Sequence, residues 1–249
     1  MSTPTKTTHS HESHVHGENT TFLNRFQDYL GEFVYGGIDG SVTTFAVVSG
    51  AAGASLSTDV VIILGFANLI ADGFAMSVGS YLSTRSEIDN YEKHKRVEYW
   101  EVDHLPEKER DEIREIYEGK GFSGPLLEQV VDVICSDRDR WVDVMMKEEL
   151  ELQETTKSPL AMGAATFISF LVVWFIPLVI YLIDYFTQSI DHLFFISSLL
   201  TSVAFVGVGY LKAKVTLTSK WRAMAETLLL GSAAAALSYL VGDYLEKLF

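Results

Sequence analysis

The sequence predicts an all-α membrane protein: five transmembrane helices, with a helical module inserted between helices two and three. Two observations carry this prediction. Of the 249 residues 48% are apolar, yet the formal net charge is −14, so the charges must be segregated. Residues 84–157 hold 21 of the 33 acidic residues and 12 of the 19 lysines and arginines, while the flanking parts contain apolar runs long enough to cross a membrane as helices. The acidic balance also argues against nucleic acid as a partner.

The chain is expected to divide into four parts. Residues 1–20 form a polar tail that is predicted to be disordered, 21–83 an amphipathic helix and two spans, 84–157 the acidic module, and 158–249 the last three spans. The tail carries four histidines. A His-rich tract can bind transition metals, but a solvated tail is the more ordinary interpretation of these residues, which are His9, His11, His14 and His16.

The first two spans follow a short amphipathic segment. Residues 22–33 carry aromatic and apolar residues on one side, which predicts a helix at the membrane surface. The first span, Phe33 to Ala54, contains Asp39 and many small residues that let helix backbones approach closely. A polar turn leads to the second span, Val60 to Ser83, whose 24 residues would run ~36 Å as a helix.

Three side chains with possible metal-ligand atoms align along the second span. Asn68, Asp72 and Met76 stand at i, i+4 and i+8, which places an amide, a carboxyl and a thioether on one face of an α-helix. An ionisable group here is costly against lipid, so it should face a partner helix, a cavity or an ion path. With Asp39 these residues suggest a path for a divalent cation and protons, the thioether favouring transition metals. The alternatives are polar contacts between helices and ordinary packing of Met76.

The module should contain four helices. The first continues from the second span to about Asp103, and the second begins at Pro106 and ends near 119–121. Ser123, followed by Gly124 and Pro125, predicts the start of the third helix. Asp137 can cap the fourth, which is expected to reach about Thr156.

Acidic residues recur in the module at helical spacings. Glu98 and Glu101 belong to one stripe of the first helix, with Glu87, Tyr91 and His94, and the second helix carries the pair Glu109 and Glu112. On the fourth helix Trp141, Met145, Glu149 and Leu152 share a face, which predicts Glu149 on the packed side. A carboxylate there must be paired, protonated or metal-bound. Spacing alone leaves metal binding and a solvated acidic face as equal alternatives.

The last three spans and the basic residues set the orientation. Apolar runs predict spans at Pro159 to Ile183, with a kink at Pro177, at Leu193 to Leu211 and at Ala223 to about Leu240. With five spans, 18 of the 19 lysines and arginines lie on the side of the N-terminus and the module. That side is therefore predicted to be cytosolic.

Three stretches carry a family resemblance: YGGIDGSVTTFAVVSG, GFANLIADGFAMSVGSYLSTRSE and ETLLLGSAAAALSYLVG. In this order, separated by an acidic helical insert, they resemble the vacuolar iron transporter family. The resemblance implies a homodimer with a path between subunits and a cytosolic metal-binding domain. It implies export of Fe²⁺, and of Mn²⁺, Zn²⁺ or Co²⁺, from the cytosol in exchange for protons, without a prosthetic group. The membrane would be vacuolar in a eukaryote and the plasma (inner) membrane in a prokaryote.

The resemblance also implies site residues. By motif, the membrane aspartate of the family falls on Asp39 and its path methionine on Met76. The cytosolic ligands fall on Glu98, Glu101, Glu109, Glu112, Met145, Met146 and Glu149. The chain departs from the family pattern at two positions, with Asn68 where many members have glutamate and Asp72 where they often have glycine. This predicts an acid displaced by one helical turn along the same face.

Two alternatives come from other classes. Glu101 and His104 have the Glu-x-x-His spacing of ferritin-like di-iron sites, which would fit a membrane-anchored ferroxidase. Such sites need a second motif of this kind, and the chain has none, so no enzymatic activity is expected. The module could also serve only for dimerisation, with its glutamates forming a solvated surface.

Overall fold

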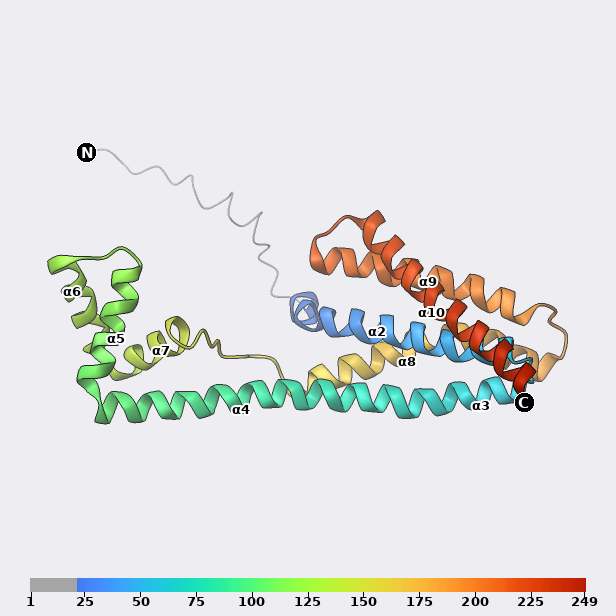
Figure 1. Cartoon of the computed structure of the whole chain (residues 1–249), viewed down its shortest axis with the longest axis horizontal. Coiled ribbons are helices and arrows are strands. Elements are labelled where there is room, and N and C mark those ends of the chain that lie inside the picture. The colour runs from blue at the N-terminus through green and yellow to red at the C-terminus, as the bar shows by residue number, and fades with distance from the viewer. Residues whose placement is uncertain (1–21) are drawn as a thin grey trace. The chain divides into compact units, whose positions relative to one another are not determined.

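The structure is a computed structural model that describes residues 22–249, with side chains from residue 29 onward (Figure 1). The predicted tail and its four histidines lie outside the described residues. Between residues 22 and 249 the structure contains helices and no strand, which agrees with the predicted all-α class. The elements are α2 (Phe22–Gly53), α3 (Thr58–Asn68), the π-helical η1 (Leu69–Gly73), α4 (Phe74–His104), α5 (Pro106–Gly119), α6 (Gly124–Cys135), α7 (Arg138–Glu148), α8 (Pro159–Thr187), α9 (Leu193–Thr216) and α10 (Lys220–Leu248).

Four helical segments among the described residues are long and apolar enough to cross a membrane: Thr58–His104, Pro159–Thr187, Leu193–Thr216 and Lys220–Leu248. The first joins α3, η1 and α4, and its apolar part is the predicted second span. The other three are α8, α9 and α10, where the last three spans were predicted. α2, the site of the predicted first span, is not among the four. Its glycines, hydroxyl residues and Asp39 dilute its apolar content.

The chain forms two compact units, and the boundary between them falls within α4. One unit comprises the chain up to Ser80 together with Leu160–Phe249, and the other comprises Tyr81–Pro159. We call them the membrane unit and the module. The predicted module, residues 84–157, lies within the second unit.

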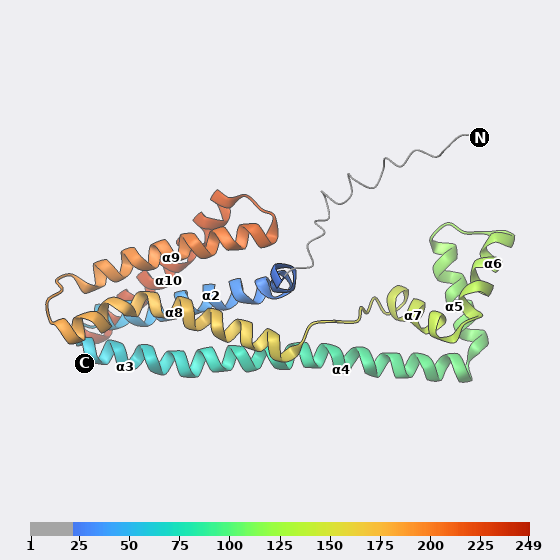
Figure 2. The ribbon, with the colours of Figure 1, turned by 180° about the vertical axis from the view of Figure 1, so that it is seen from behind.

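α2 is enclosed by the other helices of the membrane unit. It contacts α3, η1, α9 and α10, and Figures 1 and 2 show it side by side with α8 as well. A Cβ added at Gly36 would lie 2.6 Å from the carbonyl oxygen of Thr166 in α8, and one at Gly40 would lie 3.0 Å from that of Phe170. The two glycines therefore permit close backbone contact, as small residues at this spacing do. Ser41, Thr44 and Ser49 of α2 are fully buried in this packing, whereas Asp39 is half-buried.

The amphipathic segment is not a separate helix. α2 runs without a break from Phe22 to Gly53, so the predicted division near Phe33 was wrong. No proline interrupts this stretch, and a glycine inside a helix such as Gly31 costs only about 1 kcal/mol. Nothing local stops the helix from joining the following span.

The module has a small apolar core of its own. Ile113 of α5, Val131 of α6 and Met145 and Met146 of α7 are all fully buried there. Three helix starts agree with the predictions: α5 begins at Pro106, α6 follows Ser123, and α7 follows Asp137.

The predicted end of the fourth module helix was wrong. α7 ends at Glu148, well before Thr156. Glu148, Glu149 and Glu151 cluster at this end, where the carbonyl end of the helix dipole disfavours negative charge. Glu151 also has a positive φ of 53°, which an α-helix cannot continue through.

Candidate metal centre

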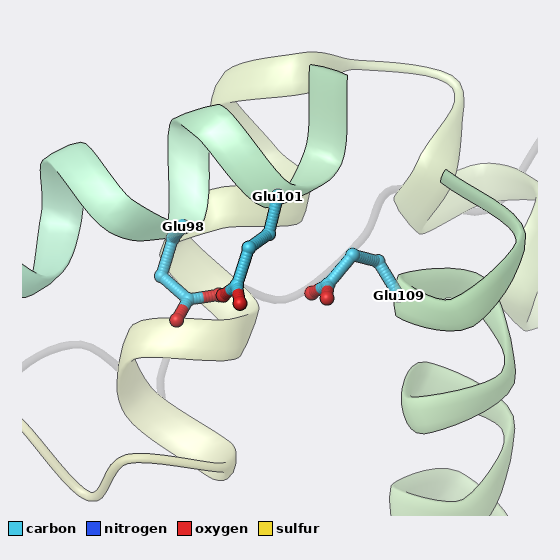
Figure 3. A group of neighbouring side chains, drawn as sticks. All are labelled: Glu98, Glu101 and Glu109. Carbon is cyan, nitrogen blue, oxygen red and sulfur yellow. The ribbon is translucent and has the colours of Figure 1, made fainter. Parts of the chain in front are cut away.

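The turn from α4 to α5 brings four predicted ligands together. α4 ends at His104, Leu105 is non-helical with φ −128° and ψ 41°, and Pro106 opens α5. Proline at this position lacks only an N–H that would have no helical partner. Because the chain turns within one residue, the last turns of α4 face the first turns of α5. Figure 3 shows Glu98 and Glu101 pointing from α4 toward Glu109 of α5.

The carboxylates form two overlapping groups. In the first group one oxygen each from Glu98, Glu101 and Glu109 lie within 4.8 Å of one another. In the second group the same holds for Glu109, Glu112 and Glu149. Glu109 therefore belongs to both groups. Three converging carboxylate oxygens are a ligand set for a divalent cation.

Two of these carboxylates are buried and lack hydrogen bonds at one or both of their oxygens. Glu98 is 3% exposed and Glu109 is 1% exposed. One carboxylate oxygen of Glu98 and both of Glu109 have no hydrogen-bond partner. Burial, followed by the negative charges of neighbouring glutamates, raises the pKa of Glu98 to about 7 and the pKa of Glu109 to about 7. These groups can therefore exchange a proton for a metal ion near neutral pH.

Glu149 reaches the second group from an unexpected position. It was predicted on the packed face of the fourth helix, but its side chain is exposed. The reason is that α7 ends one residue earlier, so Glu149 caps the helix and its backbone N–H donates to the carbonyl of Met145 over 3.1 Å. Neighbouring atoms still partly shield the Glu149 carboxyl from water. This partial burial, and then the charge of Glu112, raise its pKa.

Met145 and Met146 lie in the module core. Both are fully buried, and they pack with Tyr91 of α4 and Ile113 of α5. This packing gives both residues a structural role. Their role as thioether ligands stays a prediction.

In the membrane unit the structure connects the predicted path residues of two helices. The Asn68 amide nitrogen donates to the Thr43 hydroxyl over 3.4 Å, and that hydroxyl donates to the carbonyl of Asp39 over 2.8 Å. All four predicted path residues are half-buried: Asp39, Asp72, Asn68 and Met76. The hydrogen bonds place Asn68 beside the Asp39 turn of α2, while Met76 packs against the apolar cluster that includes Val48 and Phe170.

A π-helical turn lies inside the predicted stripe. η1 separates Asn68 from Met76 and contains Asp72, so the stripe does not follow the regular α-helical spacing on which its alignment was predicted. Gly73 of η1 packs closely against α8, where a Cβ would lie 3.0 Å from the ring of Phe170. Such turns occur frequently at functional sites.

Comparison with known proteins decides the family. The model of the VIT family matches residues 30–243, which is most of the chain and includes both sets of carboxylates. This chain belongs to the VIT family.

Several VIT relatives are similar over long stretches. A vacuolar iron transporter of Toxoplasma gondii is 40% identical over 166 residues, 66% of this chain and 54% of the relative. One of Plasmodium falciparum is 34% identical over 69% of this chain and 63% of the relative. Vacuolar iron transporter 1 of rice is 28% identical over 93% of this chain and 89% of the relative. The match thus spans just over half of the Toxoplasma protein and most of the rice protein.

With four apolar helices and this family, the chain is a multi-pass membrane protein. The ferroxidase alternative has no support. His104, its required ligand, is exposed, stacks on Trp100 with ring centroids 4.6 Å apart and bonds the Trp100 carbonyl through Nδ1. It belongs to neither carboxylate group of the described residues.

Sequence reasoning about this VIT chain missed Glu32. One of its carboxylate oxygens accepts from the hydroxyl of Ser80 in α4 over 3.1 Å and from that of Thr166 in α8 over 3.2 Å. Glu32 also lies two helical turns before Asp39 on the same side of α2. The seven-residue spacing between Glu32 and Asp39 was the available signal in the sequence. Glu32 instead fell within residues 22–33, the predicted amphipathic segment.

Proposed function

We propose that this chain is a transporter of divalent transition metal, not an enzyme, and that it moves Fe²⁺, with Mn²⁺ as a second substrate, out of the cytosol in exchange for protons. The names of its relatives support iron as the cargo. The chemistry of the site supports the divalent ion and the proton. Export of this kind serves metal storage or detoxification.

The observation that carries the proposal is the pair of buried carboxylates, Glu98 and Glu109. A buried carboxylate with oxygens that lack hydrogen bonds is destabilising unless it is protonated or bound to a cation. With Glu101, Glu112 and Glu149 beside them, two groups of three oxygens are available to a metal ion. The module would collect metal on the cytosolic side, and Met145 and Met146 would supply soft ligands after a local rearrangement of the core.

The membrane step would use Asp39, Asp72, Asn68 and Met76. A metal ion that leaves the module would displace protons from the two carboxyls, and protons from the far side would later displace the metal. The amide and the thioether would complete its coordination. The enclosed position of α2 supports its assignment as the first of five spans, because a helix surrounded by protein needs less apolar surface than one that faces lipid.

The assembly and the orientation belong to the same proposal. The chain would form a homodimer with the path between subunits. The N-terminus and the module would be cytosolic, in a vacuolar membrane of a eukaryote or the plasma membrane of a prokaryote. The basic residues at the end of α9 and the start of α10, Lys214 and Lys220 among them, support this orientation.

Iron flux into proteoliposomes tests the proposal. Purified chain should move Fe²⁺ faster when the receiving side is more acidic, and Asp39→Ala and Asp39→Asn should lower the flux at least tenfold. Asp59→Asn, which removes an exposed acid in the first turn of α3, is the matched control and should retain the flux. Unchanged Fe²⁺ flux in the Asp39 variants would contradict the path assignment. An Fe²⁺ flux that is equal with and without the pH gradient would contradict proton exchange.

A further inference from the structure

A lysine lies at the edge of the second carboxylate group. Nζ of Lys108 is 2.7 Å from a carboxylate oxygen of Glu112 and 3.7 Å from one of Glu109. Glu112 and Glu109 are two of the three members of this group. The Lys108 side chain itself is 60% exposed, so it can move away without disturbing the core.

The charge of Lys108 acts on the whole group. Lys108 is the cation among the leading influences on Glu109 and Glu149, and its charge opposes the rise in the pKa of both carboxyls. The hydrogen bond to Glu112 and then its charge raise the pKa of Lys108 itself, so the side chain stays an ammonium ion. At Glu98 the leading charged contributions come from other glutamates, Glu149 and Glu109 first.

We propose that Lys108 is a tethered competitor for the metal: its ammonium group takes the cation's place beside Glu109 and Glu112 in the metal-free module and must withdraw when a divalent ion binds there. This inference rests on the metal centre proposed above and adds a residue that sets its affinity. Two unit charges 4 Å apart interact by about 1 kcal/mol even in bulk water, and a divalent ion doubles that repulsion.

Two consequences follow for the second group. The ammonium lowers the affinity for every divalent ion, because a metal must first break the contact with Glu112. It also limits the repulsion among Glu109, Glu112 and Glu149 while no metal is present. Without Lys108 protons would bind these carboxylates more tightly too, but a divalent ion carries twice the charge and gains more.

The experiment measures Mn²⁺ binding to the full-length chain in detergent, at about 10 mM salt, where the screening length is about 30 Å. Free Mn²⁺ is followed by electron paramagnetic resonance. Lys108→Gln should bind Mn²⁺ about tenfold more tightly than the unmodified chain, which corresponds to about 1.4 kcal/mol. The gain should shrink at high salt. Lys108→Arg keeps the positive charge and should keep the original affinity.

Lys147→Gln is the matched control. Lys147 lies in the same module, is 55% exposed and pairs with Asp143 four residues before it over 2.7 Å, outside both carboxylate groups. Its loss should leave Mn²⁺ affinity unchanged. Equal or weaker binding by Lys108→Gln, with normal binding by the unmodified chain, would overturn the role of Lys108 alone. Absence of binding by the unmodified chain would overturn the metal centre and this inference with it.

Discussion

At the scale of single residues, Glu98 and Glu109 make metal-free stability depend on pH. The pKa of each is about 7 in the folded chain, against an ordinary value of 4.5. Between these values the folded state holds more protons than the unfolded state, so the free energy of unfolding falls as pH rises through this window. With a chelator present, the chain should therefore unfold at a lower temperature at pH 7.5 than at pH 5.5, with about 1–3 kcal/mol lost in total.

Removing both buried carboxylates tests this pH dependence, and an exposed glutamate of α5 provides the control. Glu98→Gln combined with Glu109→Gln should flatten the pH dependence and stabilise the chelated chain at pH 7.5, while abolishing metal binding. Glu115→Gln, on the exposed side of α5, should keep the original slope. Scanning fluorimetry in detergent measures all three. A chelated chain whose stability rises with pH would show that the buried carboxyls do not hold protons as described.

At the scale of helices, α6 and α7 offer a direct comparison of two N-caps. Asp137 accepts a hydrogen bond from the backbone N–H of Arg140 over 2.8 Å, whereas the Ser123 side chain makes no capping bond. We expect Asp137→Ala to cost about 1 kcal/mol, because an N–H of α7 loses its acceptor. Ser123→Ala should cost a few tenths of that. Thermal unfolding of the two variants distinguishes them, and equal losses would contradict the capping assignment.

The contact between α2 and α10 depends on a glycine. A Cβ at Gly242 of α10 would collide with the carbonyl oxygen of Gly50 in α2, while one at Gly207 of α9 meets nothing within 4 Å. Gly242→Ala should therefore destabilise the membrane unit by about 1–3 kcal/mol, since backbone must shift. Gly207→Ala should be neutral or slightly stabilising, because alanine favours the helix. Unfolding temperature in detergent is the measurement, and tolerance of Gly242→Ala would show that α2 and α10 are not in close contact.

Local signals explain which helix boundaries could be predicted from the sequence. Pro106, Ser123 and Asp137 act within one turn of the helices they start, so their effect is visible in the sequence. The early end of α7 is also local, but its signal, three glutamates near the last turn, was outweighed by the helical spacing of Trp141, Met145 and Glu149. The π-helical η1 is different, because Gly73 packs against Phe170, which is distant in the sequence. For the same reason spacing could put glutamates on one stripe but could not show that Glu98 and Glu109 are buried.

At the scale of the whole molecule, hydropathy and packing disagree about α2. By composition the described chain has four candidate spans and α2 is not one of them. By packing α2 is the helix that the membrane unit encloses, with Ser41, Thr44 and Ser49 fully buried on it. A helix that meets other helices on most sides is selected for small residues and close contact more than for apolarity. A hydropathy threshold suited to lipid-facing helices therefore underestimates it.

This conflict predicts a measurable topology. If α2 crosses the membrane, the N-terminus lies on the side of the α9–α10 loop, and the loop before α3 lies on the opposite side. If α2 does not cross, the N-terminus shares a side with the loop before α3.

Cysteine labelling in sealed vesicles distinguishes the two cases. The native Cys135 is replaced first by Cys135→Ser, and single cysteines are then introduced as Ser2→Cys, Ser57→Cys and Thr218→Cys. A membrane-impermeant maleimide should label Ser2→Cys and Thr218→Cys from one side and Ser57→Cys from the other, with all three labelled after permeabilisation. Shared labelling of Ser2→Cys and Ser57→Cys would remove α2 from the membrane, and with it Asp39 from any path that crosses.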